Sequence, residues 1–105
     1  MRGPGRRAAI LAHRARNGRM AGMDVGVEIS LYPLAERFAP VIHAFIEQLS
    51  AHHELKVVPG SLSTQVYGEY DQVFAAVREA VRVTLESRRT EGGRVALVLK
   101  VLGPL

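Results

Sequence analysis

Two hydrophobic periodicities alternate along this chain, and their order restricts the fold more than any other feature. From Val25 to Leu31 every second residue is apolar, which is typical of a strand with one buried face. Pro33 is expected to end this strand. Apolar residues then recur three and four positions apart, which predicts a helix whose buried stripe is Phe38, Val41, Ile42, Phe45, Ile46 and Leu49.

Both patterns return in the second half of the chain. Residues 55–58 and 62–69 read as two strands joined by a turn at 59–61. A second helical stripe runs from Val73 to Leu85, with Asp71 as its expected N-cap and two glycines after its end. Residues 94–102 form a last strand that is apolar on both faces, so we expect it to be central in the sheet.

The predicted order is therefore βαββαβ, an α+β ferredoxin-like sandwich with one four-stranded antiparallel sheet and two helices on one face. If the odd residues of the first strand face the helices, the other face of the sheet, here called the open face, is uncovered. Its surface is half apolar and half hydrogen-bonding, which is unusually adhesive for a solvated face. The expected open-face residues are Glu28, Ser30, Tyr32, Ser63, Gln65, Tyr67, Ala96, Val98 and Lys100.

Charge separates a basic N-terminal segment from one folded domain, residues 23–105. Six of the 14 basic residues lie in residues 1–22, which hold no Asp or Glu, so the domain has eight basic against ten acidic residues. This distribution argues against nucleic acid as a partner. We expect residues 1–22 to be a disordered extension: a segment that follows from a misplaced or dispensable start codon, a functional basic arm, or a targeting peptide.

Membrane insertion and export are not expected. No apolar run approaches the roughly 18 residues of a membrane span, so we expect no membrane partner. His13 and Arg14 interrupt the only apolar stretch of the N-terminal segment too early for a secretory signal, which favours a cytoplasmic protein.

The sequence offers little for catalysis or metal binding. It has no cysteine, and its four histidines lie in the N-terminal segment, on the polar side of the first helix or at that helix's end. No glycine-rich phosphate loop or histidine-supported serine is present. We therefore expect a protein that is not an enzyme and uses neither a metal nor a catalytic cofactor.

Two polar-aromatic segments, residues 29–34 and 62–70, fall on neighbouring strands in this topology. Serine, threonine and tyrosine are common both in strands and at oligomer interfaces, so chemistry alone leaves a binding role and a purely structural role open. The segments contain Ser30-Leu31-Tyr32-Pro33, then Ser63-Thr64 and Gly68 followed by Asp71.

At these motifs the chain resembles the YkoF-like family of thiamine- and hydroxymethylpyrimidine-binding domains, over nearly all of residues 23–105. The resemblance implies binding of thiamine or its hydroxymethylpyrimidine moiety without turnover. Because family domains pair through their sheets and only one copy is present, it also implies a homodimer or homotetramer. Ser30, Ser63, Thr64 and Gln65 would bond the pyrimidine, and Tyr32 or Tyr67 would stack on it. Glu28, or Glu69 beyond the sheet, would favour the thiazolium. Thr64 ranks below the others, because a regular strand points it to the opposite side.

Three alternatives compete with this interpretation. The main one is a structural or regulatory homo-oligomer without a small ligand. An RNA-binding use of the fold would need a basic-glycine-aromatic stretch, which is missing. An acylphosphatase-like enzyme would need a glycine-rich, arginine-bearing loop after the first strand, where Arg37 is the only arginine.

Overall fold

The computed structural model describes residues 22–34 and 37–105; most of the predicted N-terminal extension lies outside the described residues. The βαββαβ order is confirmed. The elements are β1 (Asp24–Leu34), α2 (Ala39–Ser50), β2 (Lys56–Pro59), β3 (Thr64–Glu69), α3 (Tyr70–Thr90) and β4 (Arg94–Leu102).

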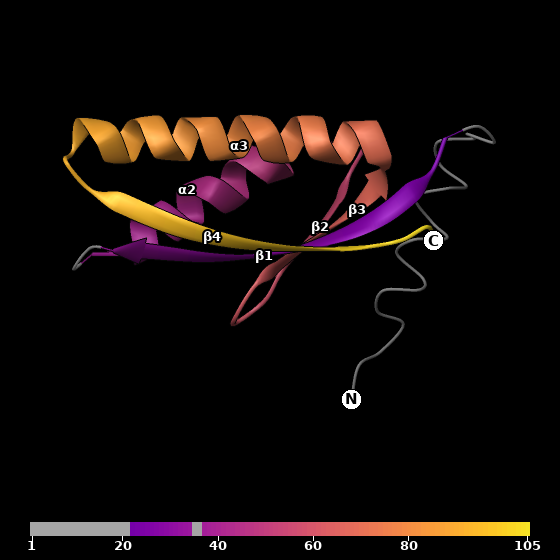
Figure 1. The fold of residues 1–105 in the computed structure, drawn as a ribbon, viewed down its shortest axis with the longest axis horizontal. Helices are drawn as coiled ribbons and strands as arrows, with labels where there is room; N and C mark the ends of the chain where they lie inside the picture. Colours follow the sequence, from indigo (N-terminus) through magenta and orange to yellow (C-terminus); the bar gives the residue numbers. More distant parts are fainter. Residues whose placement is uncertain (1–21, 35–36) are drawn as a thin grey trace.

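The four strands form one antiparallel sheet in the order β2-β3-β1-β4. Both helices lie on the same face of that sheet (Figure 1), which confirms the ferredoxin-like α+β fold. β1 is central, since it pairs with β3 over residues 24–29 and with β4 over residues 26–34. The polar-aromatic segments thus lie on adjacent strands, as predicted.

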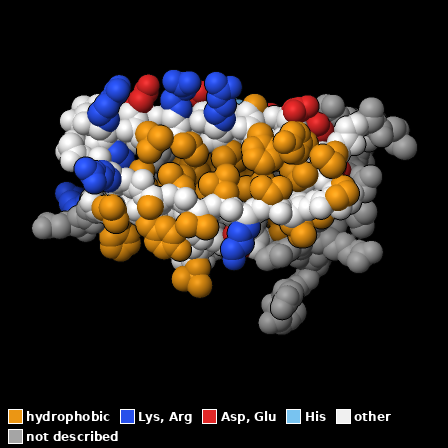
Figure 2. All heavy atoms as spheres, viewed as in Figure 1, with side chains coloured by type: hydrophobic (Ala, Val, Ile, Leu, Met, Phe, Trp, Pro, Cys, Tyr) orange, Lys and Arg blue, Asp and Glu red, His pale blue; other side chains and the backbone are white. Residues whose placement is uncertain are grey.

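The prediction that the last strand is central is wrong. β4 pairs with β1 alone and forms an edge of the sheet. Apolar residues on both faces of a strand predict that both faces are shielded from water. They do not show how many neighbouring strands the strand pairs with. Figure 2 shows apolar side chains gathered on the surface between α3 and β4, so the apolar character of β4 coincides with an exposed surface.

The core lies between the sheet and the helices. Val25, Val27 and Ile29 of β1 face the helices and are almost fully buried, which confirms the expected orientation of the first strand. Phe45 and Leu49 of α2 pack in the same cluster, together with Val73, Ala76, Val77 and Ala80 of α3. Each large side chain buried in this way contributes about 1.5 to 3 kcal/mol before the entropy of ordering is subtracted.

The first predicted helical stripe is only partly right. Phe45 and Leu49 are buried, but Phe38 is exposed because it precedes the helix as its N-cap. α2 begins at Ala39, with a proline in its first turn, where a missing N–H costs no hydrogen bond.

Several predicted boundaries also shift: β2 covers Lys56–Pro59 where 55–58 was predicted, and β3 begins at Thr64 where 62 was predicted. β1 continues through Pro33 to Leu34, and beyond Ile29 its described pairing is with β4 alone, a setting in which a strand tolerates proline. The N-cap of α3 is Glu69 and not Asp71: Glu69 Oε1 accepts a hydrogen bond from the Gln72 backbone N–H at 3.2 Å. Asp71 falls in the first turn, where its charge complements the helix dipole.

Candidate functional site

The open face of the sheet carries a shallow hollow of about 270 Å³ where β3, β1 and β4 run side by side. Glu28 of β1 lies directly opposite Gln65 of β3 on one side and Lys100 of β4 on the other. Three polar side chains therefore form one row across the sheet. The hollow is lined by Gly26, Val27, Glu28, Gln65, Tyr67, Lys100, Val101 and Leu102.

Glu28 is the centre of this row. Ser63 Oγ donates a hydrogen bond to Glu28 Oε2 at 2.8 Å, and Lys100 Nζ lies 3.9 Å from Glu28 Oε1. The ammonium of Lys100 is largely exposed, and ion pairs of that kind contribute only about 0 to 1 kcal/mol. The serine thus holds the carboxylate in place, while Lys100 can give way to another cation at little cost.

Tyr67 forms a wall of the hollow. Its hydroxyl donates to Gln65 Oε1 at 2.8 Å, which leaves the amide nitrogen of Gln65 as the donor on its other side. The ring lies against Gly26, directly opposite on β1: a β-carbon added to Gly26 would lie 2.9 Å from Tyr67 Cε1. Because Tyr67 is only 4% exposed, it shapes the hollow and does not present an open ring face.

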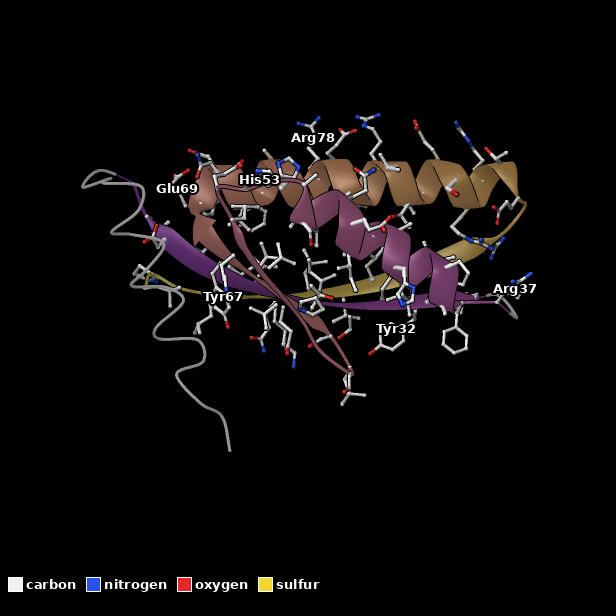
Figure 3. The ribbon with its side chains drawn as sticks, turned by 180° about the vertical axis from the view of Figure 1, so that it is seen from behind. Tyr32, Arg37, His53, Tyr67, Glu69 and Arg78 are labelled. Atoms are coloured by element: carbon white, nitrogen blue, oxygen red, sulfur yellow. The ribbon has the colours of Figure 1, made fainter. Side chains whose placement is uncertain are left out.

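Ser30 and Tyr32 lie further along β1, outside the lining of the hollow. Tyr32 is four residues from Glu28, which at strand spacing is about 13 Å. Figure 3 shows Tyr32 and Tyr67 well apart along the sheet. Tyr32 is 53% exposed and sits opposite the small residue Ala96 of β4, so its ring is accessible for stacking.

Thr64 does not join the other six predicted residues. It is buried on the helix side of the sheet, on the same face of β3 as the core residue Val66. Glu28, Ser30, Tyr32, Ser63, Gln65 and Tyr67 all belong to the open face. The structure gathers Glu28, Ser63, Gln65 and Tyr67 in one cluster and places Ser30 and Tyr32 beyond it.

Five of the eight residues that line the hollow were not among the predicted site residues: Gly26, Val27, Lys100, Val101 and Leu102. Lys100 was expected on the open face, but its position beside Glu28 depends on the β1–β4 register, which periodicity does not give. Gly26 is required by the Tyr67 ring that lies against it. A glycine within an otherwise regular strand pattern was the available signal for such a close approach.

The cluster provides a carboxylate, a hydroxyl, an amide, a phenol and an ammonium on a partly apolar floor, which suits hydrogen-bonded and charged recognition of a small polar ligand. Within residues 22–34 and 37–105, no three histidine, aspartate or glutamate side chains come together to hold a metal ion. The described helices include none that is long and apolar enough to cross a membrane.

Comparisons with solved structures agree with this fold. A Thermotoga maritima protein provisionally described as acting in thiamine biosynthesis or salvage is 28% identical and superposes with a TM-score of 0.66, over 76% of this chain and 83% of the other. A hypothetical protein of Methanocaldococcus jannascii is 25% identical, also with a TM-score of 0.66, over 77% and 80% of the two chains. A Streptococcus pneumoniae protein at 22% identity shares the fold, with a TM-score of 0.68 over 77% and 87%.

Among curated proteins no sequence gives a significant match. The sequence pattern of one family, described as thiamine-binding protein, matches residues 27–102, which include five of the six elements in full and most of β1. This chain is a member of the thiamine-binding protein family.

Proposed function

We propose that this protein binds thiamine, or the hydroxymethylpyrimidine moiety of thiamine, on the open face of its sheet and releases it unchanged. The observation that carries the proposal is the Glu28 carboxylate, fixed by Ser63 at 2.8 Å inside a hollow of a thiamine-binding family member. The Thermotoga relative, whose description concerns thiamine biosynthesis or salvage, supports the same ligand class.

The ligand's chemistry suits the cluster. An aminopyrimidine has an exocyclic amine that donates and ring nitrogens that accept, and Glu28 and the Gln65 amide supply an acceptor and a donor in one row. The thiazolium of thiamine is a cation, so it would replace Lys100 as the partner of Glu28. Both rings are flat, and the exposed Tyr32 provides a ring for stacking at the other end of the face.

A second chain would complete the pocket. A hollow of about 270 Å³ is smaller than the roughly 300 to 1,000 Å³ of ordinary ligand sites and is open to solvent. Val98 and Leu102 are exposed on the same face, next to the hollow or lining it. Another copy laid over the open face would cover these side chains and close the site in the same step.

A homo-oligomer without a small ligand is the second candidate. The exposed apolar residues of the open face favour it, because they would be buried by self-association whether or not a ligand is present. Ligand binding separates the two candidates.

Titration calorimetry of the purified protein with thiamine, hydroxymethylpyrimidine and the thiazole alcohol tests the proposal, with melting curves in parallel. We expect thiamine and hydroxymethylpyrimidine to bind and to raise the melting temperature, because a ligand of the folded state stabilises it. The thiazole alcohol lacks both the aminopyrimidine and the cationic charge and serves as the control. If none of the three binds at millimolar concentration, the ligand-free oligomer is the correct description.

A further inference from the structure

Two opposite charges line the hollow of the open face, and only the negative one is held in place. Glu28 Oε2 accepts the 2.8 Å hydrogen bond from Ser63 Oγ, which fixes the carboxylate on the sheet. Its other oxygen, Oε1, lies 3.9 Å from Lys100 Nζ, a long distance for an ion pair. The side chain of Lys100 is 78% exposed, against 36% for that of Glu28. The pair thus combines a fixed carboxylate with a movable ammonium.

The charge of Lys100 depends on Glu28 for its balance. Within residues 22–34 and 37–105, Glu28 is the one carboxylate within ion-pair distance of Lys100. Val98 and Leu102, the neighbours of Lys100 on the open-face side of β4, are apolar. Glu28 and Lys100 are the two charged residues among those that line the hollow, so the hollow itself is electrically neutral.

A ligand that brings only a positive charge disturbs this balance. In the proposed function, on which this inference rests, the thiazolium of thiamine takes the place of Lys100 beside Glu28. Lys100 then loses its partner and remains close to a second cation, which costs free energy because like charges repel. A ligand that carries an anion next to its cation removes this cost, since the anion pairs with the displaced ammonium.

We propose that the hollow selects a phosphate ester of thiamine over thiamine itself, and that Lys100 binds the phosphate. Thiamine monophosphate carries its phosphate on the two-carbon arm of the thiazolium, so its cation and its anion are close together, as Glu28 and Lys100 are. The flexible stem of Lys100 lets the ammonium follow the phosphate, and lysine is a common phosphate-binding residue. One ion pair within the protein is thereby exchanged for two with the ligand.

The other basic side chains of the described residues lie outside the hollow. Lys56, the second of the two lysines of the chain, is on β2 opposite Tyr67 and does not line the hollow. Arg37 and Arg88 line a groove shared by α2 and α3, on the face of the sheet that the helices cover. A preference for the phosphate ester therefore depends on Lys100, and a single substitution can test it.

Titration calorimetry of the full-length protein with thiamine and with thiamine monophosphate measures the selectivity. We expect the parent to bind the monophosphate about 10-fold more tightly, an effect between that of an exposed ion pair and that of a hydrogen bond between charged groups. Raising the salt concentration should narrow this ratio, because salt screens charges at an accessible side chain. If the two ligands bind equally well, the inference is wrong and the proposed function stands.

Lys100→Met tests the role of the lysine, since methionine keeps much of the apolar stem and removes the charge. The two affinities should change in opposite directions. Thiamine should bind about 2- to 3-fold more tightly, because Lys100 no longer competes for Glu28. The monophosphate should bind about 3- to 5-fold more weakly, because its phosphate has lost its partner.

A general disturbance of the sheet would weaken both ligands, so the opposite changes distinguish a phosphate-binding role from a structural one. Lys56→Met is the matched control and should change neither affinity. Melting curves confirm that both variants are folded. If the folded Lys100→Met protein keeps the preference for the monophosphate, another group binds the phosphate and the inference is wrong.

The proposed function and this inference can fail separately. If neither ligand binds the parent, the proposed function fails and the inference fails with it. If thiamine binds the parent, the ratio of the two affinities alone decides the inference.

Discussion

The ring of Tyr67 lies against the backbone of Gly26, its direct partner on the neighbouring strand, in a space that any other residue at position 26 would fill. An aromatic ring over a strand glycine covers backbone that would otherwise be open to water. The pair forms one wall of the hollow on the open face.

Gly26→Ala should destabilise the protein by about 1 to 3 kcal/mol, the usual effect of overpacking. The new methyl would lie 2.9 Å from Tyr67 Cε1 and 3.0 Å from Cδ1, so the buried ring must move and weaken its bond to Gln65. Urea unfolding measures the loss. In the double variant Gly26→Ala/Tyr67→Ala the collision is absent, so its destabilisation should be less than the sum of the two single changes. If the destabilisations of the two single variants add in the double variant, the collision between the new methyl at position 26 and the Tyr67 ring is not their cause.

Glu28→Gln should weaken thiamine binding by roughly 10- to 150-fold, which corresponds to about 1.5 to 3 kcal/mol for a hydrogen bond to a charged group. The substitution keeps one oxygen acceptor for Ser63, replaces the other carboxylate oxygen by an amide NH2 and removes the charge that attracts the thiazolium. Neutral hydroxymethylpyrimidine should lose less affinity than thiamine. Calorimetry of both ligands checks this, with Glu47→Gln on the exposed side of α2 as the control. Equal losses for the two ligands would remove the electrostatic role of Glu28.

Gly93→Ala should destabilise the end of α3. A β-carbon there would collide with Nη2 of Arg88, a side chain that is only 7% exposed. The guanidinium would have to leave its position and its 2.7 Å contact with Glu91 Oε1. We expect a loss of about 1 to 3 kcal/mol by urea unfolding. In a chain that also carries Arg88→Ala, Gly93→Ala should be nearly neutral. If Gly93→Ala destabilises that chain as much as the parent, the collision with Arg88 is not the cause of the loss.

The local elements were predictable where a single periodicity governs them. Val25, Val27 and Ile29 occupy every second position of a strand, so their burial on one face could be predicted directly from the pattern. Phe38 continues the helical spacing but stands before the first turn, so its exposure depends on where the helix begins, which spacing does not fix. The edge position of β4 could not be predicted for a similar reason. It depends on the order of strands in the sheet, which the periodicity of a single strand does not give.

The candidate site was predictable to the extent that it depends on alternation. Glu28, Ser30, Tyr32, Gln65 and Tyr67 share the open face because β1 and β3 are regular strands, and for the same reason Thr64 points to the helices. Ser63 precedes β3 and joins this group through its hydrogen bond to Glu28. The row of Gln65, Glu28 and Lys100 could not be predicted, since a shift of one residue in either register would break it.

Tyr32→Ala should weaken thiamine binding by about 1 to 3 kcal/mol, roughly 5- to 150-fold, if its ring stacks on the ligand. The side chain is exposed beside Ala96, so its removal should leave the fold intact. Because Tyr32 lies outside the lining of the hollow in its own chain, we expect its ring to contact the ligand bound to a partner chain that covers the open face.

Mixing two defective proteins tests that arrangement. Glu28→Gln and Tyr32→Ala chains are unfolded together and refolded, so that the subunits reassort. In a dimer of one Glu28→Gln chain and one Tyr32→Ala chain, one of the two pockets combines an intact Glu28 with an intact Tyr32 from the partner. Under random assortment, about one pocket in four should therefore recover full affinity. Calorimetry of the mixture detects this tight fraction. If the mixture binds no better than its parts while Tyr32→Ala alone is defective, the ring acts within its own chain. If Tyr32→Ala binds as tightly as the parent, Tyr32 is not part of the site.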